Sequence, residues 1–423
     1  MSRRRAKSPA DRARPAPPNA HRAFLAAHAS ATDTLSAQRE ARAGLYVLRL
    51  VDSLRVGLPR EQRPTPRELR AARRLVADVE PAAIRDTLDR VLDAVTDACG
   101  GTRPFVAVRL MAYARVLLND SRWAQAADVY QTFIAHAATP EDFKWIPDAY
   151  RRLAYALRMQ GQPDGAAAAV RMGLAVAASL GDVETGLRLR ISAAALERLR
   201  GNVDGADAML VEVITAAERH ALPVVRAFAV HDRGTIAYQH GRLRDAVMQF
   251  YEAWQTYVEP INRDRALGDM AMVLADLGLR DRARDAFLII SGTTVEPETR
   301  MVAMLNLLEL AAKDGHEAAF EQYRQALARE RLPARIHARY YLTLAKGWEQ
   351  LGRPAAAKAA AAKAISVASQ HGIDLTSLND PAPAPALPPS LEEQEQDHLR
   401  LAHVVRALEA ATGHAALDRA RAP

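Results

Sequence analysis

The sequence predicts an all-α protein whose main part is a solenoid of about seven consecutive helix pairs. Capping helices are expected before this array and one further helix after it. Two observations predict this fold. A short phrase recurs along the chain at a nearly constant spacing, and the segments around each copy carry apolar residues at helical spacing. Repeats with periods of 20–50 residues and helical periodicity are typical of α-solenoids, in which each unit buries its apolar face against its neighbours.

The recurring phrase is a break containing Gly, Asn or Asp, followed by an alanine and then by an apolar residue four positions later. Successive copies of the alanine lie 40, 40, 40, 37, 36 and 38 residues apart. They are Ala126, Ala166, Ala206, Ala246, Ala283, Ala319 and Ala357. A small residue also lies twelve positions before the alanine in every copy but the sixth. We therefore expect these alanines to pack where the two antiparallel helices of a pair approach closely.

This phrase resembles the tetratricopeptide repeat (TPR), in which Gly-x-(aromatic or Leu)-x-x-Ala-x3-(Phe or Tyr)-x2-Ala follows a small residue on the first helix. The aromatic and apolar positions of that pattern are matched by Trp123, Tyr130, Leu243, Phe250, Phe287 and Tyr323. The resemblance covers about residues 105–370, and it implies a right-handed superhelical array with a concave groove lined by the first helices.

The sequence departs from the TPR pattern in two ways. Its period of about 36–40 residues is longer than the usual 34 or so, as in the longer variants of some bacterial regulators and eukaryotic polarity scaffolds. A proline that often closes a family repeat recurs fourteen residues after four of the seven alanines, slightly further out than usual. These prolines are Pro140, Pro260, Pro297 and Pro333. Their position predicts second helices that are a little extended, and the second and third repeats lack the proline.

The domain organisation follows from changes in composition. We expect a disordered basic tail at 1–22, an N-terminal helical cap at 23–100, the TPR array at 105–370, a Pro/Ala linker at 379–390 and an amphipathic helix at 391–415. The cap is expected to contain one helix over 32–55 and two more over about 66–79 and 81–98. Thr65 and Glu68 predict a capping box for the second of these helices, with Pro66 at its first position. The helix pair at 66–98 lacks a glycine turn and has exposed charges of both signs, which argues against a helix-turn-helix DNA reader.

The helix after the linker has an apolar stripe formed by Leu401, Val404, Val405 and Leu408. Three arrangements of this helix remain open. It packs back on the array as a C-terminal cap, it dimerises, or it occupies the groove as an internal ligand.

The net charge of +7 is concentrated at the N-terminus. Residues 1–22 contribute seven basic side chains and one acidic side chain, so the remaining residues are nearly neutral. Such a tail can attract nucleic-acid phosphates or anionic lipid, or it is simply a solvated leader. The charge of the body therefore does not favour a nucleic-acid partner.

Signatures of catalysis and of metal binding are missing from the sequence. A single cysteine, Cys99, excludes an internal disulfide framework and cysteine-based metal cages. His316 and Glu317 begin like a zinc-protease helix, but Phe320 stands where the second histidine is required. No phosphate-binding loop, nucleophile elbow or dinucleotide fingerprint is present, and no apolar run is long enough to span a membrane. We expect a soluble, cytoplasmic, bacterial protein that is not an enzyme and has no cofactor, metal or membrane partner.

The TPR resemblance implies a set of groove residues on the first helices. They are Arg115, Arg151, Arg152, Tyr155, Arg158, Arg188, Arg198, His231 and Tyr238. The N-terminal half of this set is rich in arginine, whose forked donors suit carboxylates and phosphates, so an acidic peptide or a C-terminal carboxylate is the expected ligand. Alternatively, acidic neighbours on the same helix faces neutralise these arginines. Chaperone-binding members need asparagines where this chain has Arg115 and Tyr155, so a chaperone tail is not expected.

These observations favour a non-catalytic TPR scaffold or adaptor that binds a peptide or helical segment of a protein partner in its concave groove. The alternative is a TPR-type sensory regulator of transcription or signalling, which can touch nucleic acid through residues 1–22. A weaker third hypothesis is an RNA- or ribosome-associated factor. The sequence leaves the oligomeric state open.

Overall fold

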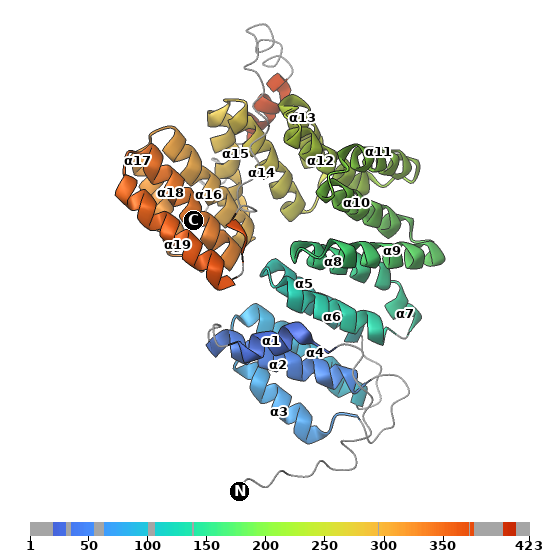
Figure 1. Ribbon diagram of the computed structural model, residues 1–423. Coiled ribbons are helices and arrows are strands. Elements are labelled where there is room, and N and C mark those ends of the chain that lie inside the picture. Colours follow the sequence, from blue (N-terminus) through green and yellow to red (C-terminus); the bar gives the residue numbers. More distant parts are fainter. Residues whose placement is uncertain are drawn as a thin grey trace. The chain divides into compact units, whose positions relative to one another are not determined.

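The computed structural model describes residues 20–30, 35–54, 63–99, 106–137, 139–294, 296–371, 373–375 and 401–411 (Figure 1). These residues form α-helices joined by short turns, and none of them is in a β-strand. The chain divides into two units, Met1–Leu196 (unit 1) and Glu197–Pro423 (unit 2). No helix within the described ranges is long and apolar enough to cross a membrane.

Unit 1 begins with four helices that precede the repeats. They are α1 (Arg22–Ala29), α2 (Leu35–Asp52), α3 (Pro66–Ala77) and α4 (Ala82–Cys99). The expected capping box is present, since Thr65 Oγ1 accepts from the Glu68 N–H at 3.3 Å and the Glu68 carboxylate accepts from the Thr65 N–H at 2.8 Å. His21 is buried and Arg22 begins α1, so the basic tail ends earlier than the expected residue 22. Its residues 1–19 lie outside the described part of the chain.

A buried polar cluster joins α1 and α2 to α6 (Trp123–His136). The Asp52 carboxylate accepts hydrogen bonds from His21 Nε2 at 2.8 Å and from His136 Nε2 at 2.9 Å. Asp128 of α6 accepts a further bond from the Ala23 N–H at 2.9 Å, at the start of α1. These bonds fix the first helix on the first repeat, because buried polar groups are stable only when their hydrogen bonds are satisfied.

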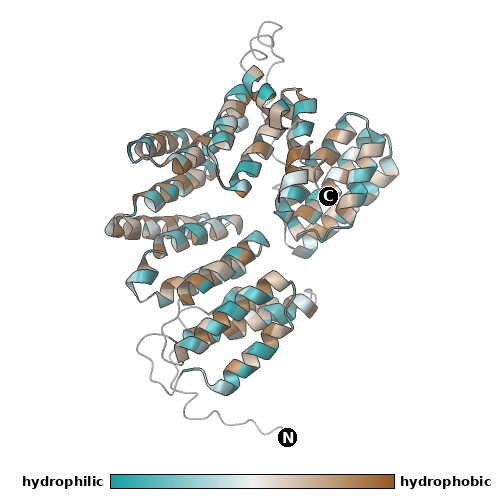
Figure 2. Cartoon of the chain, turned by 180° about the vertical axis from the view of Figure 1, so that it is seen from behind, coloured by the Kyte–Doolittle hydropathy of each residue, from teal (hydrophilic) through white to brown (hydrophobic). Residues whose placement is uncertain are grey.

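The repeats follow as seven helix pairs in sequence order. The pairs are α5 (Val106–Asn119) with α6, α8 (Ile146–Met159) with α9 (Pro163–Leu180), α10 (Val183–Leu199) with α11 (Val203–Arg219), α12 (Pro223–Gln239) with α13 (Leu243–Thr256), α14 (Pro260–Asp276) with α15 (Arg280–Thr293), α16 (Pro297–Lys313) with α17 (Glu317–Ala328), and α18 (Ala334–Gln350) with α19 (Pro354–His371). The short α7 (Pro140–Phe143) lies between the first two pairs. Hydrophobic and hydrophilic residues lie on different sides of these helices, as expected when each helix buries one stripe (Figure 2).

The predicted breaks are turns with left-handed backbone geometry. Gly161 has a φ of 69°, and the N–H of the next residue, Gln162, donates to the Leu157 carbonyl at 2.9 Å. This is the hydrogen bond of a Schellman motif, which satisfies an otherwise unpaired carbonyl at the end of a helix. The same turn joins the helices of every pair, with glycine at the left-handed position in six pairs and Ser121 in the first.

In the first six repeats, a fully buried residue of the second helix lies five residues after the left-handed residue of the turn. In the first five repeats this position is one of the predicted alanines, and each is fully buried. In the sixth repeat it is Phe320, which is fully buried, whereas Ala319 is only half-buried. The assignment of Ala319 is therefore wrong by one residue, because the distance from the turn glycine, Gly315, fixes the register. Ala357, in the last pair, has the expected register but is half-buried.

The prediction that the recurrent proline marks an extended second helix is wrong. Repeats with the recurrent proline have short second helices, and α13 and α15 contain 14 residues each. The long second helices are α9, α11 and α19, with 18, 17 and 18 residues, in the three repeats that lack the proline. Pro260 and Pro297 occupy the first position of the next helix, where a missing N–H costs no hydrogen bond. The proline therefore starts a helix after an extended residue and does not mark an extended second helix.

Residues 401–411 form a helix that packs back on unit 2. Leu401, Val404 and Leu408 are buried in the same hydrophobic cluster as residues of α13 and α15. Arg282 of α15 forms an ion pair with Glu409 at 2.5 Å. Of the three arrangements left open by the sequence, the structure thus has the helix packed on the array. It lies on second helices and not on the last pair, while the rest of the expected 391–415 helix and the 379–390 linker lie outside the described residues.

Larger side chains at the fully buried alanines should destabilise the array. We expect Ala206→Leu in α11 and Ala246→Leu in α13 each to lower the free energy of unfolding by about 1–3 kcal/mol, because the added carbons have no space between the packed helices. The measurement is denaturant unfolding followed by circular dichroism. Ala208→Leu, at an exposed position of α11, is the control. Unchanged unfolding of both buried variants would contradict the register.

Candidate functional site

Most of the predicted groove residues lie in unit 1 on the first helices of successive pairs. Arg115 is on α5, Arg151, Arg152, Tyr155 and Arg158 are on α8, and Arg188 is on α10. Arg115 is exposed and has no ion pair with a described residue. The others lie on α8 and α10, where Arg188 is near enough to lower the pKa of Arg151.

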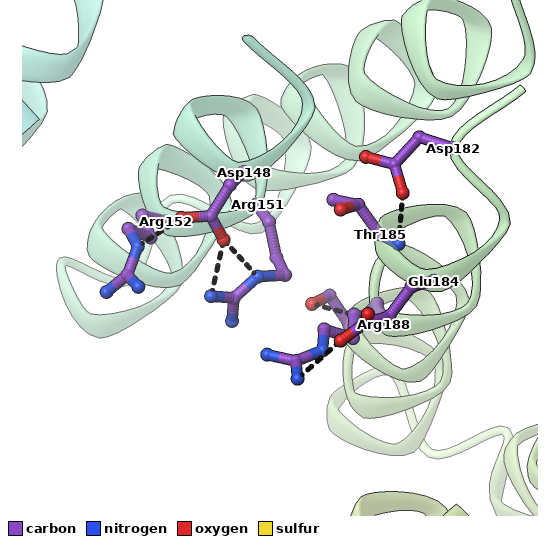
Figure 3. Close-up of polar contacts among 8 residues, drawn as sticks. Asp148, Arg151, Arg152, Asp182, Glu184, Thr185 and Arg188 are labelled. Atoms are coloured by element: carbon purple, nitrogen blue, oxygen red, sulfur yellow. Dashed lines mark hydrogen bonds and ion pairs between the residues drawn. The ribbon is translucent and has the colours of Figure 1, made fainter. Parts of the chain in front are cut away.

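The carboxylate of Asp148 holds two of these arginines. Its Oδ1 accepts from Arg151 Nε at 2.9 Å and from an Arg151 terminal nitrogen at 2.6 Å, while its Oδ2 accepts from Arg152 Nε at 2.7 Å (Figure 3). The three residues lie three and four positions apart on one helix, the spacing at which side chains meet. One carboxylate therefore pairs with two guanidinium groups.

Arg188 reaches the same region from the next first helix. It pairs with Glu184, one turn earlier on α10, at 2.8 Å. In Figure 3 the guanidinium groups of Arg151 and Arg188 point toward the same space between α8 and α10. We call Asp148, Arg151, Arg152, Glu184 and Arg188 the arginine cluster. It contains three cations and two anions, and Asp148 pairs with two of the three cations.

The charges of the arginine cluster shift the pKa values of their neighbours. Burial alone would raise the pKa of the Asp148 carboxyl, but Arg151 and Arg152 outweigh that effect and hold the pKa below its usual value. Burial lowers the pKa of Arg151, and the nearby cations Arg152 and Arg188 lower it further, against the opposing effect of Asp148. Each arginine thus raises the electrostatic cost of its neighbours, and an added anion would reduce that cost.

An aromatic surface adjoins the cluster on α8. Tyr155, four residues after Arg151, is 39% exposed. Its ring packs edge-on against Trp123 of α6, with 5.8 Å between the ring centroids, and the Arg158 guanidinium lies 5.3 Å from its centroid. The first helix of the second repeat therefore presents cationic and aromatic groups along one face.

The predicted groove residues of unit 2 do not form a comparable group. His231 is buried, bonds to Asp269 Oδ2 at 2.7 Å and packs edge-on against Phe250, so it is a core residue of its repeat. The hydroxyl of Tyr238 donates to Asp276 at 2.7 Å. Arg198 is half-buried near the end of α10. His231 lies fifteen residues before the recurrent alanine of its repeat, the same register as Arg151. The register in the repeat alone therefore does not predict which of these side chains is buried.

Sequence reasoning missed the two carboxylates of the cluster. The signal was present, because Asp148 precedes Arg151 and Arg152 by three and four residues and Glu184 precedes Arg188 by four. The hypothesis that acidic neighbours neutralise the arginines is therefore partly realised in the structure.

Comparisons with known proteins agree on the fold. No family model and no curated protein sequence matches the chain. Among solved structures, NprR in complex with its cognate peptide NprX is 17% identical, with a TM-score of 0.50 over 78% of this chain and 98% of that one. Apo NprR, a quorum sensor from B. thuringiensis, is 17% identical over 79% of this chain and 88% of that one, with a TM-score of 0.47. The Rap conjugation gene regulator of plasmid pLS20, in complex with the Phr* peptide, is 14% identical over 78% and 95%, with a TM-score of 0.47. Together with the repeated helix pairs, the likeness to peptide-bound NprR establishes that the chain is an all-α protein with a TPR-like α-solenoid fold.

Proposed function

We propose that this protein is a non-catalytic, cytoplasmic binding protein that holds an acidic peptide, or an acidic segment of a protein partner, on the first helices of unit 1. The observation that carries the proposal is the arginine cluster. Guanidinium groups from two successive repeats point toward one space, and two of them share the single carboxylate of Asp148.

The chemistry of binding follows from the geometry of the cluster. A guanidinium group presents several N–H donors in one plane and can hold a carboxylate with two parallel hydrogen bonds. Asp148 and Glu184 use some of these donors and hold the arginines in fixed orientations. A ligand carboxylate between α8 and α10 would accept from the remaining donors, and Tyr155 would contact an apolar side chain of the same peptide.

The likeness to NprR supports a peptide as the ligand. NprR was solved with its cognate peptide NprX bound, and its fold is similar to that of this chain. The same cluster would serve an adaptor that holds a partner segment or a regulator that responds to a free peptide. The two differ in the ligand, since a partner segment is part of a longer chain and a signal peptide has a free C-terminal carboxylate.

Binding of synthetic peptides tests the proposal. We expect the full chain to select acidic sequences from a library of eight-residue peptides, and a selected peptide labelled with fluorescein to bind more weakly as salt increases. Arg151→Gln combined with Arg188→Gln should weaken binding at least about tenfold, which corresponds to about 1.4 kcal/mol. Arg171→Gln, an exposed arginine on the second helix α9, is the matched control.

Two outcomes would contradict the proposal. One is selection of basic or neutral peptides, and the other is equal affinity of the wild type and the double variant. Amidation of the peptide C-terminus then distinguishes the two kinds of ligand. A loss of affinity on amidation indicates recognition of a free C-terminus, and unchanged affinity indicates recognition of acidic side chains within a longer segment.

A further inference from the structure

A second candidate site lies in unit 2, among the last three helices of the array (Figure 1). α16 packs closely against both α17 and α18, and α18 packs closely against α19. Between α17, α18 and α19 the side chains leave a cavity of about 830 Å³. This volume is within the range of small-molecule sites in proteins, roughly 300–1,000 Å³.

Aromatic side chains on α18 form much of the wall of this cavity. Tyr340, Tyr341 and Trp348 line it, with Leu327 and Leu344 beside them. The rings are fixed by mutual packing, since the centroids of Tyr340 and Tyr341 are 5.2 Å apart and Trp348 packs edge-on against the buried Phe320 at 4.7 Å. The Tyr340 hydroxyl also donates to the Arg324 carbonyl of α17 at 3.1 Å. Three rings of α18, each packed against another ring, therefore form one side of the cavity.

Basic side chains outnumber acidic ones around the cavity. Four basic residues line it, Arg324, Arg331, Arg353 and Lys363, against the acidic Glu321 and Glu330.

The acidic side chains leave two of these cations without a carboxylate partner. Glu321 is bound by Arg324 through two hydrogen bonds, and Arg353 pairs with Glu317. Arg331 and Lys363 have no ion pair within the described residues. The ammonium group of Lys363 lies 5.4 Å from the centroid of the Tyr341 ring.

We propose that this cavity binds a small organic anion with a planar, aromatic body, such as an aryl carboxylate or sulfonate. The body would pack against the rings of α18, and its negative group would pair with Lys363 and Arg331. Aromatic side chains favour planar ligands by stacking, and a nearby cation that has no carboxylate partner favours an anionic substituent. This site is separate from the arginine cluster and does not depend on the proposed peptide binding.

The test uses two dyes of similar shape and different charge with the full-length protein. 8-Anilinonaphthalene-1-sulfonate is the anionic probe, and N-phenyl-1-naphthylamine is its neutral analogue. We expect one anionic dye molecule to bind per chain, as measured by fluorescence titration and calorimetry. Lys363→Gln combined with Arg331→Gln should weaken binding of the anionic dye at least about fivefold and change binding of the neutral dye by less than twofold. Lys358→Gln, an exposed lysine of α19 outside the cavity, is the charge control.

A second pair of variants tests the location of the site. Ala359 lines the cavity and Ala362, on the same helix, does not, although both are exposed enough to accept a larger side chain. Ala359→Trp should fill the cavity and abolish binding of the anionic dye, whereas Ala362→Trp should leave it unchanged. Equal affinity for Ala359→Trp and Ala362→Trp would overturn the proposal. Equal losses of affinity for the two dyes in the Lys363→Gln and Arg331→Gln double variant would also overturn it, because the negative charge of the dye would then have no specific role.

Discussion

Replacing Phe320 with alanine is expected to lower the free energy of unfolding of unit 2 by about 3–5 kcal/mol, as measured by denaturant unfolding of the full chain. Phe320 is fully buried and occupies the position that alanine holds in the other repeats. Its ring fills the space left by Gly347 of α18, the first helix of the next pair. Truncation would leave a cavity that neighbouring rigid rings such as Trp348 cannot close.

Gly347 provides the control that distinguishes this fit from ordinary loss of a large side chain. A Cβ atom at Gly347 would lie 2.8 Å from Cζ of Phe320, closer than packed carbon atoms tolerate. Gly347→Ala alone should therefore destabilise the protein. In the Phe320→Ala background the same substitution should cost much less, since the ring is gone. Strictly additive losses in the two single variants and the double variant would show that the residues are not matched.

Replacing Asp52 with alanine is expected to lower the stability of unit 1 by about 2–5 kcal/mol. The side chain of Asp52 is 9% exposed and accepts hydrogen bonds from His21 and His136. Its removal leaves two imidazole N–H groups without this acceptor in a place where water has little access. The measurement is thermal unfolding near neutral pH. Asp86→Ala, at an exposed position on α4, should change stability by less than about 0.5 kcal/mol.

The pH dependence gives a second test of Asp52. Burial alone would raise its pKa, but the hydrogen bonds from His136 and His21 outweigh burial and hold the pKa below the usual 3.8. A carboxylate with a lowered pKa in the folded state stabilises fully above its unfolded pKa and loses that contribution as pH falls through the folded pKa. The part of the stability difference between wild type and Asp52→Ala that comes from the Asp52 carboxylate should therefore be constant above a pH of about 4. It should become smaller in more acidic solution. A difference that grows on acidification would contradict the assignment.

The repeat architecture was predictable because its determinants are local. A left-handed turn needs glycine, a packed helix pair needs a small residue, and both recur in the sequence at nearly constant spacing. The capping box at Thr65 was predictable for the same reason, since all its atoms lie within four residues. The one error of register, at Ala319, arose where two alanines precede Phe320. Counting from the turn glycine would have avoided that error.

Features that depend on distant residues were not predictable in this way. Asp52 meets partners 31 and 84 residues away in sequence, and no local pattern links them. The burial of His231 depends on Asp269 of the next repeat and on Phe250 of its own second helix. The helix at 401–411 was predicted from its apolar stripe, but its position on α13 and α15 depends on a surface formed only after folding. In the candidate site, the arginines were predicted from the repeat register, whereas the sharing of Asp148 between two of them required the structure.

The lengths of the second helices have a consequence for how this array can change in evolution. α9 and α11 exceed α13 and α15 by three or four residues, which is close to the 3.6 residues of one helical turn. Adding a full turn returns the following residues to nearly the same helix face, so both lengths bury the same stripe. Insertions and deletions of three or four residues are thus compatible with the packing of neighbouring pairs, whereas a change of two residues rotates the stripe by about 200° toward solvent. The second helices α9 and α11 therefore differ from α13 and α15 by about one whole helical turn, a change that keeps the buried stripe on the same face.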